Sequence, residues 1–252
     1  MAKKLNNNMI VVVTGGAKGI GYAIAEEFLN EGAKTVFLID INEKQGSEVA
    51  TILNSEYGNG KAVFLKGDVT KDLDKIYSEI VNKHGHIDIL VNNAGVADEL
   101  SIRRTLEINT VATVEWSMKF YENMRKDKGG RGGVILNIAS IYGYLVDQHA
   151  PFYKTSKYAV MGFTKTLGHA VNYETTGVKV IVICPGVTKT DIVKNVTQNE
   201  AFDFHVEKFQ DFLDSAPSQE KEDVAKAAVE IVANSQSGLA WSIISGKLEQ
   251  LP

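Results

Sequence analysis

Residues 11–21 read Val-Val-Val-Thr-Gly-Gly-Ala-Lys-Gly-Ile-Gly. The stretch begins as a short apolar run, turns through closely spaced glycines and continues into residues 22–31, whose composition favours a helix. This pattern predicts a buried strand, a tight turn and a helix whose first free N–H groups point at whatever lies over the glycines. Because such a turn cradles phosphate groups, we expect it to bind the pyrophosphate of a dinucleotide.

A second apolar run, at 36–39, follows about 20 residues on and ends in the carboxylate of Asp40. In a dinucleotide-binding fold, this is the position of the acceptor for the hydroxyls of the adenosine ribose. A 2′-phosphate there would meet a like charge, which favours NAD over NADP. The basic residue Lys18, directly before Gly19, points the other way, but we give Asp40 more weight because its position requires a direct contact with the ribose.

Composition and charge are those of an ordinary globular protein, with 44% hydrophobic and 23% charged residues in a chain of 252. The net charge of −4 favours neither a nucleic-acid partner nor a membrane surface. The single cysteine, Cys184, cannot form an internal disulfide, and the first residues lack the apolar core of a signal peptide. We therefore expect one domain over residues 1–252, in the cytoplasm.

Apolar runs and helical patterns alternate along the rest of the chain. Because the expected strands are apolar on both faces, we predict an α/β fold with a doubly wound parallel sheet of about seven strands. A phenylalanine-rich stretch interrupts this order, and we expect the segment around 191–215 to form a lid over the substrate. The further strands are expected at 62–65, 87–91, 134–138, 178–184 and 239–244, and the helices at 43–57, 71–84, 101–127, 150–175 and 222–234.

Polar groups gather after the ends of the predicted strands. In an open parallel sheet, ligands bind at the carboxyl ends of the strands, near the point where the strand order reverses. The sequence therefore predicts one binding region along this edge of the sheet. The residues that follow strand ends are Gly15, Asp40, Asp68, Asn92, Ser140 and Pro185.

Tyr153 and Lys157 lie four residues apart in a predicted helix, on one face and about 6 Å apart along its axis. A tyrosine with a pKa near its reference value of about 10 is a poor base at neutral pH, but an adjacent ammonium and a cationic nicotinamide lower that pKa. Oxidation of an alcohol needs such a base. Ser140 can hold the substrate oxygen, and Asn109 can order a water that passes the proton onward.

Together these motifs resemble those of the short-chain dehydrogenase/reductase family over almost the whole chain. The resemblance implies a Rossmann-type domain with a Ser–Tyr–Lys–Asn active site in which Lys157 also binds the nicotinamide ribose. The matching motifs are Thr14-Gly-x-x-x-Gly19-x-Gly21, Asp68-Val69, Asn92-Asn93-Ala94-Gly95, Asn109, Ser140, Tyr153-x-x-x-Lys157 and Pro185-Gly186 followed by Thr190.

The same resemblance implies how the cofactor, NAD, is held. Asp68 and Val69 would hold the adenine, Asn92 would help shape the cleft, and residues 187–190 would hold the carboxamide end. The expected cofactor contacts are Gly15, Lys18, Gly19, Ile20, Gly21, Asp40, Ile41, Asp68, Val69, Asn92, Ala94, Gly95, Tyr153, Lys157, Pro185, Gly186, Val187, Thr188 and Thr190.

Within the family, residues 95–109, 129–133, 185–190 and 238–241 are similar to the insect-type alcohol dehydrogenases and the 15-hydroxyprostaglandin dehydrogenases. The prostaglandin enzymes have a glutamine three residues before the catalytic tyrosine, where this chain has Ala150. We therefore expect the substrate to be a medium-sized, largely apolar secondary alcohol, oxidised to its ketone. The residues expected to contact it are Ser140, Tyr142, His149 and Ile192, within a pocket that also includes Ile141, Tyr144 and the 196–213 stretch with Phe202 and Phe204.

Other functions stay open at this stage: a hydroxyprostaglandin, farnesol, hydroxysteroid or retinoid dehydrogenase, or a catalytically silent relative that only binds the cofactor. A silent relative would be expected to have lost Ser140, Tyr153 or Lys157, and all are present. The histidines show no metal-ligand spacing, so we expect no metal. The helices at 101–127 and 150–175 are expected to join copies into a homodimer or homotetramer.

Overall fold

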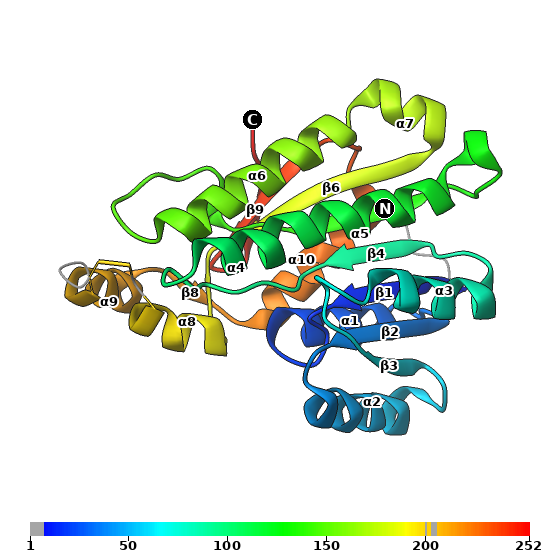
Figure 1. Cartoon of the computed structure of the whole chain (residues 1–252), viewed down its shortest axis with the longest axis horizontal. Coiled ribbons are helices and arrows are strands. Elements are labelled where there is room, and N and C mark those ends of the chain that lie inside the picture. The colour runs from blue at the N-terminus through cyan, green and yellow to red at the C-terminus, as the bar shows by residue number, and fades with distance from the viewer. Residues whose placement is uncertain (1–7, 200, 203–205) are drawn as a thin grey trace.

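The computed structural model describes residues 8–199, 201–202 and 206–252, and its centre is an eight-stranded sheet (Figure 1). The strands lie in the order β10-β9-β6-β5-β4-β1-β2-β3, and every neighbouring pair is parallel except β9 and β10. The strands are Ile10–Thr14 (β1), Thr35–Asp40 (β2), Ala62–Lys66 (β3), Ile89–Asn92 (β4), Gly133–Ile138 (β5), Val178–Pro185 (β6), Ala240–Ile244 (β9) and Lys247–Gln250 (β10).

The predicted doubly wound parallel sheet is confirmed, with one strand more than expected. The chain turns back after β9 through Ser245 and Gly246, whose φ angles are +50° and +73°. A two-residue turn with positive φ matches the twist of a hairpin, so β10 adds to the sheet edge in antiparallel register. A separate two-stranded ribbon pairs Val187–Thr188 (β7) with Ser218–Gln219 (β8).

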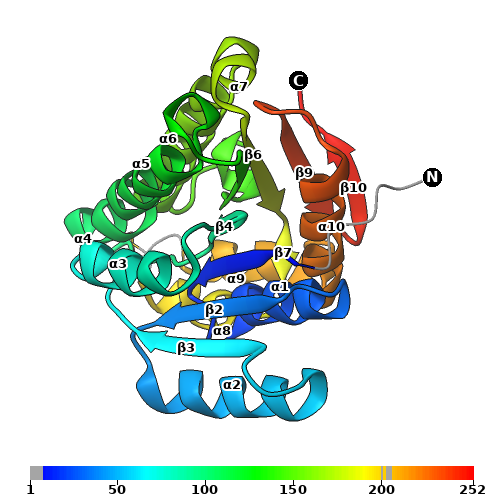
Figure 2. The ribbon, with the colours of Figure 1, turned by 90° about the vertical axis from the view of Figure 1, so that its right-hand side faces the viewer.

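Helices cover both faces of the sheet (Figure 2). One face carries α1, α2 and α10, and the other carries α3, α5 and α6. The helices are Gly19–Asn30 (α1), Glu43–Tyr57 (α2), Leu73–His84 (α3), Ile102–Leu106 (α4), Thr113–Met124 (α5), Pro151–Leu167 (α6), Ala170–Thr176 (α7), Asp191–Asn195 (α8), Val206–Ser215 (α9) and Lys221–Asn234 (α10).

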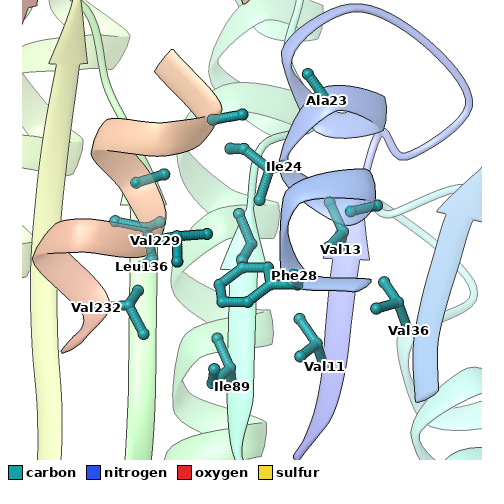
Figure 3. Close-up of a cluster of buried hydrophobic side chains, with 14 of the residues drawn as sticks. Val11, Val13, Ala23, Ile24, Phe28, Val36, Ile89, Leu136, Val229 and Val232 are labelled. Atoms are coloured by element: carbon teal, nitrogen blue, oxygen red, sulfur yellow. The ribbon is translucent and has the colours of Figure 1, made fainter. Parts of the chain in front are cut away.

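The alternation of side chains along β1 shows why both faces are needed. Val11 and Val13 pack on the α1 side, whereas Ile10 and Val12 pack on the α3 and α5 side, and all are at most 1% exposed. On the first side, Phe28 of α1 lies over the strands among aliphatic side chains from β1, β4 and α10 (Figure 3). The centre of the sheet is therefore buried on both faces and gives the site a rigid base.

Two of the predicted long helices are interrupted. The 101–127 helix contains a π-helical turn at Glu107–Ala112 (η1), and a 3₁₀ turn, Lys126–Lys128 (η2), follows α5. The 150–175 helix is split into α6, which ends at Leu167, and α7. At Gly168 between them a β-carbon would be 2.5 Å from the Val180 carbonyl oxygen, so only glycine allows this close approach. Within the described residues, no helix has both the length and the apolar character needed to cross a lipid bilayer.

The expected lid segment leaves the sheet after β6 and β7. It contains α8, a 3₁₀ turn at Val196–Asn199 (η4) and α9, and Figure 1 shows α8 and α9 grouped at the end of the molecule opposite α7. Phe209 of α9 is 1% exposed and packs with Tyr142 and Ala150. A further 3₁₀ turn, Ile141–Gly143 (η3), follows β5 and lies against α6.

Candidate active site

The glycine-rich turn between β1 and α1 has the backbone that the sequence predicts. Gly15 and Gly19 have φ angles of +65° and +58°, which residues other than glycine rarely adopt. At Gly21, a β-carbon would lie 2.3 Å from the Gly15 carbonyl oxygen, so only glycine lets α1 start this close to the turn. The three glycines thus serve the turn and the close packing that a phosphate-binding loop needs.

A polar clamp holds this turn against the end of β4. The Thr14 hydroxyl accepts hydrogen bonds from the backbone N–H groups of Asn93 (3.0 Å) and Ala94 (3.1 Å). The Asn93 side chain donates in return to the carbonyl oxygens of Thr14 (3.0 Å) and Gly15 (3.1 Å). The motif around Asn93 therefore fixes the distance between two strand ends, a role that the sequence analysis did not assign to Thr14 or to Asn93.

Asp40 stands at the end of β2, on the rim of the cleft beside this turn. Its carboxylate accepts hydrogen bonds from the backbone N–H groups of Ala17 (3.1 Å) and Asn42 (3.0 Å), which hold it in place. Lys18 is on the same rim and forms an exposed ion pair with Asp191 of α8 at 3.6 Å, which offsets part of its positive charge. This arrangement leaves the negative charge of Asp40 to dominate where the ribose hydroxyls are expected.

The cleft runs along the carboxyl ends of β1 to β4. Asp68 and Val69 line it at the far end, and Asp68 is held by Thr70 and by an ion pair with Lys71 at 3.2 Å. A groove with a glycine turn, a helix N-terminus and a carboxylate on its rim fits a dinucleotide. Of the expected contacts, those that line this cleft are Gly15, Lys18, Gly19, Ile20, Asp40, Ile41, Asp68, Val69, Ala94, Gly95 and Thr190.

Asn92 does not line the cleft. It is 4% exposed, and its side chain donates to the Ser117 hydroxyl and to the Asn137 side-chain oxygen, both at 2.9 Å. Because successive residues of a strand point to opposite faces, Asn92 points into the core beside β5 while Asn93 reaches the cleft. Gly21 is also behind the cleft surface, where it serves packing.

Tyr153 and Lys157 line a second hollow, which adjoins the cleft and shares Asn93, Gly95 and Thr190 with it. The Lys157 ammonium lies 5.5 Å from the centre of the Tyr153 ring and donates to the Ile138 carbonyl oxygen at 2.9 Å. Burial raises the pKa of Tyr153 to about 12, against an opposing hydrogen bond from Ser140, and burial lowers the pKa of Lys157 to about 8. In the protein by itself, burial therefore outweighs the lowering of the tyrosine pKa that we expected from the ammonium.

Ser140 and Asn109 have different positions relative to Tyr153 and Lys157. Ser140 begins η3 and lines the second hollow beside Tyr153, and its hydroxyl accepts a hydrogen bond from Tyr142 N–H at 3.2 Å. Asn109 is 1% exposed in the π-helical turn, and its side chain bonds the backbone N–H and the carbonyl oxygen of Val96, each at 2.8 Å. It also donates to the Ser156 hydroxyl at 3.0 Å. The Asn109 side chain thus fixes the loop beside Lys157.

The second hollow is apolar. Lys157 is the only charged residue among the described ones that line it, and aromatic and aliphatic side chains from η3, α8 and α9 make up most of its wall. Pro185, Gly186, Val187, Thr188 and Thr190 also line it, and Thr190 lines the cleft as well, near where the carboxamide end of a dinucleotide is expected. The side chains of this wall are Ala97, Ile141, Tyr142, Ala150, Ile192, Val193, Phe209, Phe212 and Leu213.

Several residues that the sequence analysis expected in the substrate pocket do not line the second hollow. His149 is 4% exposed and stacks on Phe209 with ring centres 4.6 Å apart, so Phe209 separates it from the hollow. Tyr144 packs against the core near Met161 instead. Phe202 is 43% exposed and does not line the hollow, and Phe204 lies outside the described residues. No group of three or more His, Cys, Asp or Glu side chains in the described ranges could hold a metal ion.

Comparisons with known proteins identify the family of this chain. Residues 9–201 match the family model of the short chain dehydrogenases. The chain is 37% identical to rat 15-hydroxyprostaglandin dehydrogenase [NAD(+)] over 80% of its length and 76% of the rat protein. It is 30% identical to alcohol dehydrogenase 2 of the fruit fly Ceratitis cosyra over 96% of its length and 93% of that protein. The family resemblance predicted from the motifs is confirmed: this chain belongs to the short-chain dehydrogenase family of oxidoreductases.

Proposed function

We propose that the protein is an NAD-dependent dehydrogenase that oxidises medium-sized, apolar secondary alcohols to ketones. The observation that carries this proposal is that Tyr153 and Lys157 line an apolar hollow that shares part of its wall, at Asn93, Gly95 and Thr190, with the polar cleft. A polar cleft suited to a dinucleotide lies on one side, and an apolar pocket suited to a hydrocarbon chain lies on the other. A reacting carbinol carbon placed between them would have the tyrosine at its oxygen.

The cofactor is NAD in this proposal. Asp40, held by two backbone N–H groups, is placed to accept hydrogen bonds from ribose hydroxyls and to repel a 2′-phosphate. The rat relative is named for its use of NAD(+) and points the same way. When bound, the nicotinamide supplies the hydride acceptor, and the protein supplies binding, orientation and proton transfer.

The side chains around the reacting carbon have separate tasks. The Tyr153 oxygen takes the proton of the alcohol, and the Ser140 hydroxyl holds the same substrate oxygen in reach. Lys157, anchored at the Ile138 carbonyl oxygen, keeps a positive charge beside the tyrosine and binds the nicotinamide ribose. Asn109 holds the Val96 backbone, and with it the loop that packs against Lys157. Together these residues form the proposed Ser–Tyr–Lys–Asn site.

The apolar wall supports an uncharged substrate. Each methylene that the pocket buries is worth about 0.8 kcal/mol, which is about fourfold in efficiency. Charged sugars or hydroxy acids would have to give up hydration without a cation other than Lys157 to meet them among the described lining residues. The two relatives named for hydroxyl-bearing substrates fit the same reaction class.

The test is the rate of NADH formation with purified protein and a series of 2-propanol, 2-butanol, 2-hexanol and 2-octanol. We expect kcat/KM to rise with chain length until the pocket is filled. Farnesol, hydroxysteroids and a hydroxyeicosanoid, measured in parallel, decide whether a larger lipid alcohol is preferred. Independence of chain length, or a preference for charged sugars or hydroxy acids, would refute the proposed substrate class.

We also propose that copies of the chain associate through the α4 to α6 face, as a homodimer or homotetramer. Val111, Met118 and Tyr158 are 46%, 38% and 40% exposed on it, whereas Trp116 and Phe120 belong to the core. Apolar side chains exposed on neighbouring helices favour burial against a second copy. Light scattering at micromolar concentration tests this, and a monomeric mass would refute it.

Within each copy, we propose that the chain is a single domain in which residues 191–215 form the lid of the substrate pocket.

A further inference from the structure

Glu99 lies in the loop that joins β4 to α4 and is 2% exposed, although it is a charged residue. Its two carboxylate oxygens accept hydrogen bonds from the backbone N–H groups of Phe152, at 2.8 Å, and Tyr153, at 2.6 Å. These groups belong to the first turn of α6, the helix that carries Tyr153 and Lys157. A carboxylate more than 50 residues earlier in the chain is therefore attached to the backbone of the proposed base.

The start of α6 depends on this outside partner. The residue before the helix is Ala150, which has a φ angle of +50° and no side-chain acceptor with which to cap it. Pro151 follows and has no N–H group, so the first free N–H groups of the helix are those of Phe152 and Tyr153. Both are bonded to Glu99, which does at a distance what a capping residue ordinarily does from its own position.

The loop that carries Glu99 contacts the site at its other end too. A β-carbon on Gly95 would lie 3.2 Å from the Asn109 side-chain oxygen and 3.7 Å from the Lys157 ammonium. The backbone N–H of Glu99 donates to the Asn199 carbonyl oxygen at 3.0 Å, which ties the loop to the expected lid segment. One short loop thus joins the cofactor cleft, the lid segment and the backbone of Tyr153.

We propose that Glu99 is a positioning residue, which fixes the first turn of α6 so that the Tyr153 hydroxyl meets the substrate oxygen. This rests on the proposed role of Tyr153 as the base. A carboxylate suits the task because its two oxygens accept from two N–H groups at once, and its negative charge lies at the positive end of the helix. Since Glu99 touches neither hollow, its loss should change how well the tyrosine is placed rather than what is bound.

The test compares Glu99→Gln, Glu99→Ala and a matched control, Asp223→Ala. Asp223 caps α10 through the Glu220 N–H at 3.0 Å and is part of a helix with no proposed catalytic residue. For Glu99→Ala we expect kcat to fall between about 10-fold and 100-fold, because small misplacements of a reacting group cost this much. The KM for 2-octanol and the Kd for NADH should stay within about twofold of wild type.

Glu99→Gln keeps one acceptor and should restore most of the lost kcat. Glu99→Ala should also show a larger rate decrease on deuteration of the carbinol carbon, since hydride transfer becomes slower than cofactor release. Asp223→Ala should keep kcat within about twofold while its Tm falls, which separates positioning from general loss of stability. If Glu99→Ala does not fold, Glu99→Asp carries the comparison: its shorter side chain cannot hold both N–H groups in the same place, so kcat should fall by about 10-fold.

Equal kcat values for Glu99→Ala, or for Glu99→Asp in its place, and Asp223→Ala would overturn the inference. The inference would also be overturned if weaker binding of the cofactor accounted for the whole loss of activity in Glu99→Ala. If wild type oxidises no alcohol with NAD, the proposed function fails and the role of Glu99 fails with it. If wild type is active and the Glu99 variants match it, only the inference fails.

Discussion

The two adjoining hollows, the proposed cofactor cleft and the proposed substrate pocket, are built from different parts of the chain. The cofactor cleft is lined mainly by the turns that directly follow β1, β2, β3 and β4. The substrate pocket takes its wall from η3, α6, α8 and α9, which are distant in sequence and connected by loops. The cleft is therefore fixed by the sheet itself, and the pocket by how later segments fold over the sheet.

This difference separates what is common to a family from what is particular to one protein. Positions such as Gly15, Gly21 and Asp40 are tied to backbone geometry, so few residue types satisfy them. The pocket positions need only an apolar side chain of suitable size, and many sequences satisfy that. Changes in the cleft should therefore affect all substrates alike, whereas changes in the pocket should alter the choice among substrates.

The largest effect is expected at Tyr153, the proposed base. Tyr153→Phe should lower kcat by about 1,000-fold or more, because the proton path is removed while the ring still fills its place. The Kd for NADH should change by less than about threefold. Initial rates with 2-octanol and a fluorescence titration with NADH measure the two quantities. If the variant kept a third of wild-type kcat, another base would have to be sought.

Lys157→Ala should impair both catalysis and cofactor binding. Its ammonium lies beside the Tyr153 ring and is also proposed to bind the nicotinamide ribose. We therefore expect a loss of turnover together with weaker NADH binding. Normal cofactor affinity in this variant would remove Lys157 from the cofactor site.

The next largest effect is the pH dependence of the two reaction directions. Burial raises the pKa of Tyr153 to about 12, and oxidation uses the phenolate, whose fraction increases with pH below that pKa. Oxidation should therefore speed up by as much as about tenfold per pH unit from the acid side. Ketone reduction uses the protonated phenol and should not gain from the same change. Rates in both directions between pH 6 and pH 8 test this, and oxidation that slows as the pH rises would contradict it.

The preference for NAD over NADP is expected to be a smaller effect than the loss of kcat in Tyr153→Phe. A like-charge pair at ~4 Å and an effective dielectric of ~20 costs roughly 4 kcal/mol, and exposure of the Asp40 rim to solvent reduces that value. We expect NAD to be preferred over NADP by about 50-fold in kcat/KM. Asp40→Asn keeps an acceptor for the Ala17 N–H and should lower the preference by about tenfold or more. Equal efficiency with NADP in wild type would overturn the NAD assignment.

The smallest effect is expected in the pocket. Phe212→Ala removes part of the wall, so the rise of kcat/KM with alcohol length should flatten by a few-fold across the series. Phe202→Ala is the matched control, since Phe202 is exposed in the same segment and does not line the pocket. Equal slopes in wild type and Phe212→Ala would show that α9 does not contact the substrate.

The sequence predicted the sheet and most of the cleft, because each strand end is marked by a short motif. It misplaced Asn92, since the strand alternation that turns one asparagine inward and the next outward depends on where β4 ends. The π-helical turn at Asn109 could not be predicted, because the composition of 101–127 is that of an ordinary helix.

The pocket was harder to predict for a physical reason. His149 looked exposed to the substrate, but Phe209 of α9 stacks on it from outside the local sequence. Glu99 gave no signal at all, since an acidic residue in a polar loop is ordinarily a solvated one. Both depend on contacts between segments that are distant in sequence, α9 with His149 and the β4–α4 loop with the first turn of α6.

The most direct test of the proposed function follows the hydrogen that leaves the alcohol. Wild-type protein is given NAD and 2-octanol that carries deuterium on its carbinol carbon, and the reduced cofactor is examined by mass spectrometry. We predict that the reduced nicotinamide carries the deuterium, that 2-octanone forms in equal amount, and that Tyr153→Phe forms neither at a comparable rate. A reduced cofactor without the label, or no reduced cofactor with any secondary alcohol, would contradict the account.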